Sequence, residues 1–167
     1  MLQNKKGYLN KMKNIKILRT ILIILIVLWT CLIFLFSSQD GGESSGFSRM
    51  VVEFFVKDPE MVNFLEPYAR KIAHFSEYGI GGLLFVSLFS TYNWSDKRKM
   101  ITSILLGMWY ATMDEIHQLM VPGRSGAFKD VYIDTLGVAT GVVGMMIIIK
   151  IFEMRKNKKD KKVESEV

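Results

Sequence analysis

The sequence predicts an all-α membrane protein: a bundle of four transmembrane helices, with both termini cytoplasmic and a short amphipathic helix in an external loop. Half of the 167 residues are hydrophobic although 23% are charged, and the mean hydropathy is +0.22. The apolar residues fall into runs of about 20, the length with which a helix crosses the hydrocarbon core. Lysine and arginine gather between alternate runs, as in multi-pass proteins. One folded domain is expected at this length.

Four apolar runs form the predicted membrane domain, residues 15–152. The four helices are predicted at about 15–36, 71–92, 100–121 and 130–152. The first follows a basic segment and so resembles a signal peptide, but its apolar core is longer than is usual there. No small-x-small cleavage pattern follows it either, so we expect a retained helix. The other three carry ionisable residues mainly towards one end.

Basic residues predict the orientation of the helices. The tail 1–14, the loop with Lys97, Arg98 and Lys99, and the tail 153–167 are rich in them, whereas the loop 37–70 is sparser. Cytoplasmic segments hold this excess, so both termini are predicted to be cytoplasmic. The net charge of +6 therefore indicates topology and contact with anionic lipids, not nucleic-acid binding. The carboxyl-terminal tail is expected to be disordered.

The external loop 37–70 begins with the polar segment SSQDGGESSG and then becomes amphipathic. Met50, Val51, Phe54 and Phe55 have the spacing of an amphipathic helix at the membrane surface. The pair Asp58-Pro59 should end this helix, and a second short turn is expected before Pro67. The helix either roofs a site or merely connects two spans, and its periodicity does not distinguish these roles.

Polar residues of three helices converge in this topology. The second helix begins outside, the third ends outside and the fourth begins outside. At 1.5 Å per residue, Glu77, Asp114 and Asp134 lie within roughly 10 Å of the outer boundary. Residues three or four positions apart share a helix face. On the second helix the shared face holds Arg70, His74 and either Glu77 or Tyr78. On the third it holds Tyr110, Asp114, His117 and Gln118, and on the fourth Asp130 and Asp134, continued by Gly137, Gly141 and Gly144.

Two details refine these faces. Glu115 points about 100° away from Asp114 on its helix. The three glycines form a small-xxx-small seam of the kind that lets helices approach closely, so the acids beside them should point into the bundle. Such groups can serve packing alone, but a charge in the bilayer costs about 2.5 to 3.5 kcal/mol, and interhelical polar contacts return about 0.6 on average. A functional site is therefore the preferred interpretation.

Three ordered motifs give the sequence a resemblance. They are Phe36-Ser-Ser-Gln39; Arg70-Lys-x-Ala-His-Phe-x-Glu-Tyr78; and Tyr110-Ala-x-x-Asp-Glu-x-His-Gln118 with Val-Pro-Gly-Arg124 and Asp130-Val-x-x-Asp134. Together they resemble the VanZ-like family of small bacterial membrane proteins, named after a teicoplanin-resistance protein. Met120 and Gly81 depart from the family's usual residues without touching the polar positions. The resemblance implies a multi-pass protein of the bacterial cell membrane that contributes to tolerance of teicoplanin-type lipoglycopeptides. It does not supply a mechanism.

The first of three mechanisms is an enzyme at the outer face that acts on a membrane lipid or a lipid-linked cell-envelope precursor by hydrolysis or group transfer. The candidate catalytic residues are His74, Glu77, Asp114, His117 and Asp134. The candidate binding residues are Arg70, Lys71, Tyr78, Glu115, Gln118, Arg124 and Asp130. His74 or Asp114 would act as acid or base with Glu77 as its partner, and Arg70 with Arg124 would hold a phosphate or carboxylate.

A metal-dependent variant of this mechanism is also open. His74 and Glu77, and likewise Asp114 and His117, are spaced three residues apart and could together hold zinc or another divalent ion. The chain has no recognised metal motif, so the cofactor stays unknown.

The second mechanism is binding of a cell-wall precursor or of the drug without chemistry. The third is a small lipid or proton-coupled transporter, because acids and histidines in membranes often relay protons. A chain of this size would need to form a homo-oligomer for transport, and the oligomeric state is open. The sequence alone does not decide whether the protein is an enzyme.

Overall fold

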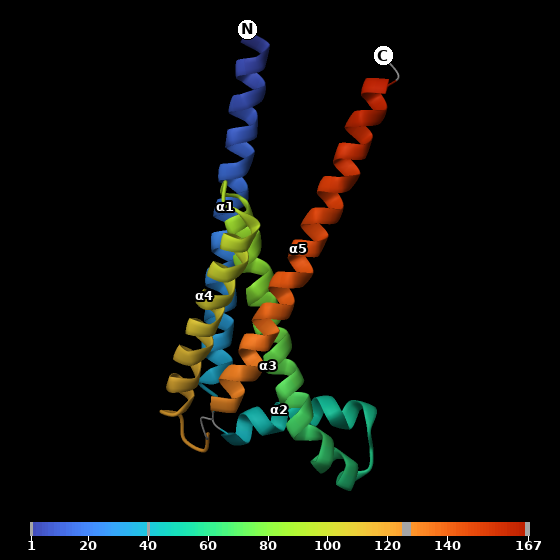
Figure 1. Ribbon diagram of the computed structural model, residues 1–167. Coiled ribbons are helices and arrows are strands. Elements are labelled where there is room, and N and C mark those ends of the chain that lie inside the picture. Colours follow the sequence, from blue (N-terminus) through green and yellow to red (C-terminus); the bar gives the residue numbers. More distant parts are fainter. Residues whose placement is uncertain (1, 40, 125–127, 166–167) are drawn as a thin grey trace.

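The computed structural model describes residues 2–39, 41–124 and 128–165. Within these ranges the chain forms five helices and no strand: α1 (Leu2–Ser37), α2 (Gly41–Phe55), α3 (Pro59–Ser90), α4 (Asp96–Gln118) and α5 (Phe128–Ser165). Four helices run side by side, α2 lies across one end of them, and both termini project from the opposite end (Figure 1). The predicted all-α architecture is confirmed.

Three of the helices are long and apolar enough to cross a membrane. They are the segments Leu9–Ser37, Pro59–Ser90 and Phe128–Lys159 among the described residues, which indicates a multi-pass membrane protein. The shorter α4 does not meet the same criterion, because charged and amide residues occupy both of its ends. α4 nevertheless packs against α3 and α5. The fourth crossing therefore remains a prediction.

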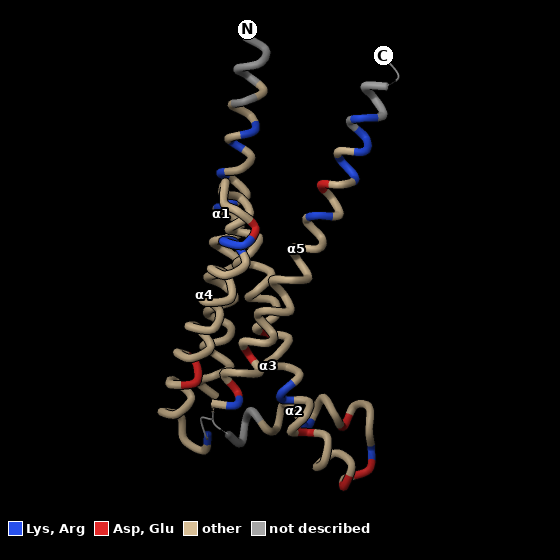
Figure 2. Tube along the Cα trace, viewed as in Figure 1, with Lys and Arg blue, Asp and Glu red and all other residues tan. Residues whose placement is uncertain are grey.

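Basic residues gather at one end of the bundle. Figure 2 shows them on the projecting parts of α1 and α5 and around the start of α4. This is the distribution on which the predicted orientation depends. Which end faces the cytoplasm stays a prediction.

α3 begins at Pro59, earlier than the predicted 71. Asp58 is its N-cap and accepts a hydrogen bond from the Glu60 amide at 3.1 Å, and Pro59 suits the first turn because that position needs no amide hydrogen. The predicted end of α2 near Asp58-Pro59 is thus confirmed. The turn expected before Pro67 is wrong, because Pro67 lies inside α3. Much of the predicted loop 37–70 is therefore a hairpin of α2 and the first turns of α3.

The first and last helices, α1 and α5, are also longer than predicted. α1 begins at Leu2 and α5 continues to Ser165, so the tail 153–167 is helical over most of its length where disorder was expected. Lysine and glutamate are good helix formers, and a helix satisfies its own backbone hydrogen bonds without tertiary contacts. α4 begins at Asp96 because Ser95 caps it, with its hydroxyl accepting from the Arg98 amide at 3.3 Å.

Glycines allow α3 and α5 to pack backbone to backbone. A Cβ atom at Gly137 would collide with the Phe75 backbone, and one at Gly141 with the backbone of Gly79. Both positions therefore behave as the predicted seam requires. The expectation is wrong for Gly144, where a Cβ atom would meet nothing within 4 Å.

Trp29 of α1 anchors the other side of the core. Its ring packs edge-on against Tyr78 at 6.1 Å and lies 5.0 Å from the ring of Tyr110. Its indole nitrogen donates to the Glu77 carbonyl at 2.9 Å. A Cβ atom at Gly81 would come within 2.5 Å of the Trp29 ring, so this glycine makes room for the indole. α1 is thereby fixed against α3 one turn from the polar residues.

Candidate functional site

A cavity of about 230 Å³ opens where α2, α3, α5 and the loop after α4 meet. It is lined by Ser45, Pro67, Arg70, Lys71, His74, Gln118, Gly123, Arg124, Asp130, Ile133 and Asp134. A smaller space of about 70 Å³ adjoins it, lined by Ile33, Phe36, Ser37, Gln39, Phe47, Ser48, Arg70, Ala73, His74, Glu77, Asp114 and Arg124. The two spaces share Arg70, His74 and Arg124, and together they are called the polar cavity below. α2 forms one of its walls.

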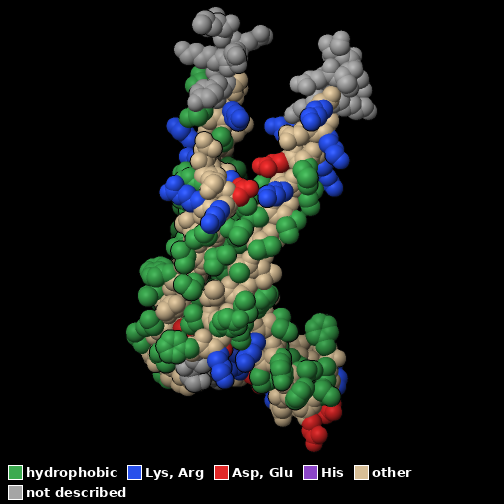
Figure 3. Space-filling view, viewed as in Figure 1, with side chains coloured by type: hydrophobic (Ala, Val, Ile, Leu, Met, Phe, Trp, Pro, Cys, Tyr) green, Lys and Arg blue, Asp and Glu red, His purple; other side chains and the backbone are tan. Residues whose placement is uncertain are grey.

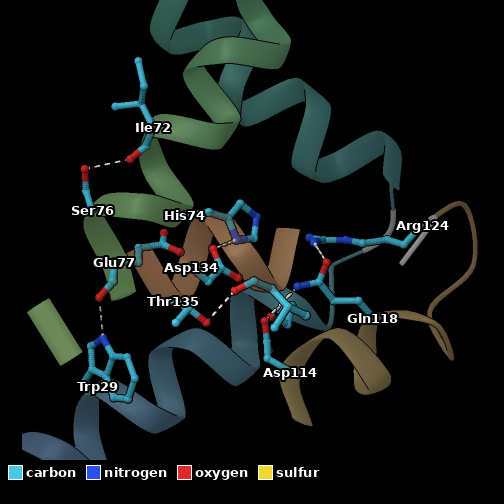
Figure 4. Close-up of polar contacts among 12 residues, drawn as sticks. Trp29, Ile72, His74, Ser76, Glu77, Asp114, Gln118, Arg124, Asp134 and Thr135 are labelled. Atoms are coloured by element: carbon cyan, nitrogen blue, oxygen red, sulfur yellow. Dashed lines mark hydrogen bonds and ion pairs between the residues drawn. The ribbon is translucent and has the colours of Figure 1, made fainter. Parts of the chain in front are cut away.

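His74 and Asp134 face each other at the bottom of the polar cavity. His74 Nδ1 lies 3.8 Å from Asp134 Oδ1, and the side chains are 23% and 1% exposed. Neither atom has a hydrogen-bond partner among the described residues. Unpaired buried polar atoms are rare and unfavourable, so each calls for an explanation. Figure 4 shows both side chains pointing into the space between α3 and α5.

Arg124 connects the end of α1 to the end of α4. Its Nε donates to the Gln39 carbonyl at 3.0 Å, its Nη2 to the Phe36 carbonyl at 2.9 Å and its Nη1 to Gln118 Oε1 at 3.0 Å. The carbonyls at a helix C-terminus carry partial negative charge, which favours a cation there. Burial lowers the pKa of the Arg124 guanidinium, and Asp114 partly opposes this. Arginine stays charged in proteins. Arg124 therefore holds the ends of α1 and α4 together and also adds positive charge to the cavity.

Gln118 continues this network to Asp114. Its amide nitrogen donates to Asp114 Oδ2 at 2.8 Å and to the Ser37 hydroxyl at 3.4 Å. All three side chains are buried. The amide oxygen faces Arg124 and the amide nitrogen faces the carboxylate, so each end of the amide meets a group of opposite character. Asp114 is therefore held in place by Gln118, which makes it less available than His74 as a base.

Arg70 supplies positive charge on the α3 side of the polar cavity. Its Nη2 donates to the Ser45 hydroxyl and to Glu66 Oε1, each at 2.6 Å. Its Nε is buried without a hydrogen-bond partner among the described residues, and Lys71 lines the cavity beside it. The sequence analysis missed Ser45 and Glu66. Glu66 lies four residues before Arg70, a signal of helical pairing that the supposed turn at Pro67 concealed.

Four further predicted residues differ in how they lie relative to the polar cavity. Asp130 lines the larger space, and Glu77 lines the smaller one. Tyr78 is fully buried against Trp29 and is not among the residues that line either space. Glu115 is buried as well, although its helical position turns it away from Asp114.

His117 lies apart from the other candidate residues. Its Nε2 is 3.1 Å from the Ser38 hydroxyl, and its ring stacks on Phe34 at 4.5 Å. It lines neither space of the polar cavity. In the described part of the chain, no three histidine, cysteine, aspartate or glutamate residues are grouped so that they could hold a metal ion. The four-residue metal set suggested by spacing is thus not brought together.

Comparison with known families identifies the chain. A family profile described as VanZ/LLP1 matches residues 22–150. The chain belongs to the VanZ/LLP1 family. All residues that line the polar cavity of this VanZ/LLP1 protein fall within the match, whereas the basic ends of α1 and α5 fall outside it. No curated protein and no solved structure matches the chain.

The arrangement in this VanZ/LLP1 protein combines two chemical capacities. Arg70 and Lys71 offer positive charge and unpaired donors to an anion. His74, with the buried Asp134 beside it, offers an imidazole that can accept or donate a proton. Both lie in one cavity, so an anionic group bound by the first would lie within reach of the second.

Proposed function

We propose that this VanZ/LLP1 protein binds an anionic, lipid-linked molecule of the cell envelope in the polar cavity and catalyses its hydrolysis or a group transfer from it. The observation that carries the proposal is the shared cavity in which Arg70 and Lys71 stand beside the His74–Asp134 pair. The predicted orientation places this cavity in the outer leaflet, where the headgroups of envelope precursors are displayed.

His74 is the proposed acid and base. With Nδ1 turned towards Asp134, the Asp134 carboxylate favours the tautomer that carries its proton on Nδ1, which leaves Nε2 free to accept one. His74 Nε2 takes a proton from a water molecule or an acceptor hydroxyl, and the oxygen of that water or hydroxyl bonds to the reacting atom. The bond from that atom to the leaving oxygen breaks, and His74 returns the proton to that oxygen. The 3.8 Å separation is long, as catalytic contacts often are before ligand binding.

Arg70 and Lys71 are the proposed anion ligands. Arg70 retains a buried, unpaired Nε–H, and Lys71 lines the cavity beside it and adds an ammonium group. Arg124 plays a different part from the bidentate one that its sequence position suggests, because its guanidinium already donates three hydrogen bonds within the protein. It contributes its charge and keeps the wall of the cavity in place.

Drug tolerance fits this chemistry. A change in an outer-leaflet precursor would alter what a teicoplanin-type lipoglycopeptide meets at the cell surface. We propose that tolerance follows from the altered precursor rather than from contact between this protein and the drug. A binder without chemistry would leave the precursor unchanged.

The experiment compares envelope lipids and lipid-linked precursors, by mass spectrometry, in cells that lack the gene, carry it, or carry His74→Ala. The expected result is a chemical species that appears or disappears only with the unaltered gene, at equal membrane abundance of the variant. If the lipid profiles of all three strains are identical and the His74→Ala strain keeps its drug tolerance, the proposal of catalysis is rejected in favour of binding without chemistry.

A further inference from the structure

An apolar groove of about 260 Å³ runs between α2 and the first turns of α3, outside the polar cavity. Its walls include Val51, Val52 and Phe55 on α2, and Leu65, Ala69 and Ile72 on α3. Figure 3 shows hydrophobic side chains over this hairpin, next to a group of Lys and Arg side chains. The groove is thus an apolar space beside a cationic one.

The groove and the polar cavity border each other where α2 contacts α3, on adjoining faces of α3. On α3, Ala69 lines the groove and the next residue, Arg70, lines the cavity. On α2, Ser48 lines the cavity and Val52, one turn further on, lines the groove. A molecule whose charged head lies in the polar cavity would therefore have its apolar tail beside the groove.

We propose that the α2–α3 groove binds the hydrocarbon chain of an anionic membrane lipid whose phosphate headgroup lies against Arg70 and Lys71 in the polar cavity. The proposal rests on the proposed function for the position of the headgroup and adds the place and chemistry of the tail. From Leu65 to Ile72 the groove extends about 10 Å along α3, at 1.5 Å per residue. Several methylene groups fit along that length, and each one buried strengthens binding by about fourfold.

Exposed aromatic residues support a lipid as the occupant rather than a protein. Phe54 and Phe55 are 77% and 78% exposed on α2, and Phe64 and Tyr68 are more than half exposed on α3. Aromatic residues of this kind are enriched where a protein meets the interface of a bilayer. The hairpin therefore lies where a lipid chain reaches the groove without passing through water.

The test uses the full chain in a neutral glycoside detergent and measures binding of dodecyl phosphate and of inorganic phosphate by calorimetry. Dodecyl phosphate should bind at least tenfold tighter than inorganic phosphate. Ala69→Trp fills the groove and should weaken dodecyl phosphate binding about tenfold while leaving inorganic phosphate unchanged. Arg70→Gln should weaken both. Leu105→Trp, which adds the same ring at an exposed position on α4, is the matched control and should change neither.

Val51→Asn provides a milder second variant if Ala69→Trp folds poorly, because Val51 is 42% exposed. It should weaken dodecyl phosphate binding several-fold by placing an amide in the groove. Unchanged affinity for dodecyl phosphate in both variants would place the tail elsewhere and overturn the proposal. A change of oligomeric state in Ala69→Trp, with lipid binding intact, would make a second copy of the chain the occupant and overturn it equally.

The groove and the proposed reaction fail separately. Suppose the purified protein binds dodecyl phosphate more tightly than inorganic phosphate, but the precursors in cells do not change with the gene. This result would support the groove and reject the catalysis. A precursor change that persists in Ala69→Trp, with unaltered binding of dodecyl phosphate, would retain the catalysis and reject the groove.

Discussion

His74 Nδ1 faces Asp134 Oδ1 across 3.8 Å at the junction of α3 and α5, and neither atom has another hydrogen-bond partner among the described residues. Both residues line the polar cavity, but Asp134 is almost completely buried whereas His74 is partly exposed. A buried carboxylate behind a histidine that faces a cavity is the arrangement by which an acid orients a base. The two residues should therefore act as one unit.

A double-substitution cycle tests this coupling. His74→Gln and Asp134→Asn should each lower the rate of precursor conversion by about 10²- to 10⁴-fold, the usual contribution of general acid–base catalysis. The double variant should be no slower than His74→Gln alone, because Asp134 acts only by orienting His74 and has no further effect once the imidazole is gone. Conversion rates in membrane vesicles at equal protein abundance measure this. Losses that multiply in the double variant would show that the residues act independently.

The two histidines of the chain should differ in their effects. His74→Ala should abolish the precursor change and drug tolerance, because His74 lines the polar cavity. His117→Ala should retain both, since His117 contacts Ser38 and Phe34 outside it. Tolerance assays and precursor analysis compare the pair at matched abundance. Equal loss in both variants would favour a metal bound by both histidines, and metal analysis of the purified protein would then decide.

Arg124→Lys should destabilise the protein. A lysine can keep only part of the contacts with Gln39, Phe36 and Gln118 because it lacks the planar fork of donors. With about 1.5 to 3 kcal/mol for each hydrogen bond to a charged group, we expect a loss of about 2 to 4 kcal/mol. Thermal unfolding in detergent measures it, with Arg155→Lys on the exposed end of α5 as control. An unchanged Tm would mean that the loop does not depend on this network.

The glycine seam provides a matched pair of substitutions. Gly141→Ala places a methyl group against the Gly79 backbone, whereas Gly144→Ala places one in open space. Overpacking costs about 1 to 3 kcal/mol, so Gly141→Ala should lower the Tm by pushing α5 away from α3. Gly144→Ala should leave the Tm unchanged or raise it, since alanine is the better helix former. Equal Tm values in the two variants would contradict the close backbone contact of α3 with α5.

The sequence predicted the convergence on the polar cavity better than it predicted the limits of the helices. The apolar runs and the spacing of Arg70, His74 and Asp134 were sufficient to place these side chains in one cavity. The helical period sets the face on which each side chain lies, and the order of the helices sets which ends meet. The turn predicted before Pro67 is wrong, because α3 continues through this proline. A proline interrupts only local hydrogen bonds, and whether the helix continues depends on its tertiary packing.

His117 illustrates a second limit. It shares a helix face with Asp114 and Gln118 by spacing, yet those two are buried and hydrogen-bonded to each other, while His117 stacks on Phe34 outside the polar cavity. A helix face is broad, and the neighbouring helix decides which part of it meets which partner. The same reasoning explains Arg124: its charge was visible in the sequence, but the three acceptors around it come from two segments that only the fold brings together.

The membrane crossing of α4 is the last prediction, because length and hydropathy leave it open. Single cysteines are introduced as Asn93→Cys and Pro122→Cys, at exposed positions just outside the two ends of α4, after the one native cysteine is replaced by Cys31→Ser. If α4 crosses the membrane, an impermeant maleimide added to whole cells should label Pro122→Cys, and Asn93→Cys should react only after the membrane is permeabilised. Lys158→Cys, near the basic end of α5, is the control for the cytoplasmic side and should behave like Asn93→Cys. Labelling of both α4 positions from one side would leave only three crossings and would remove the outer-leaflet placement of the polar cavity.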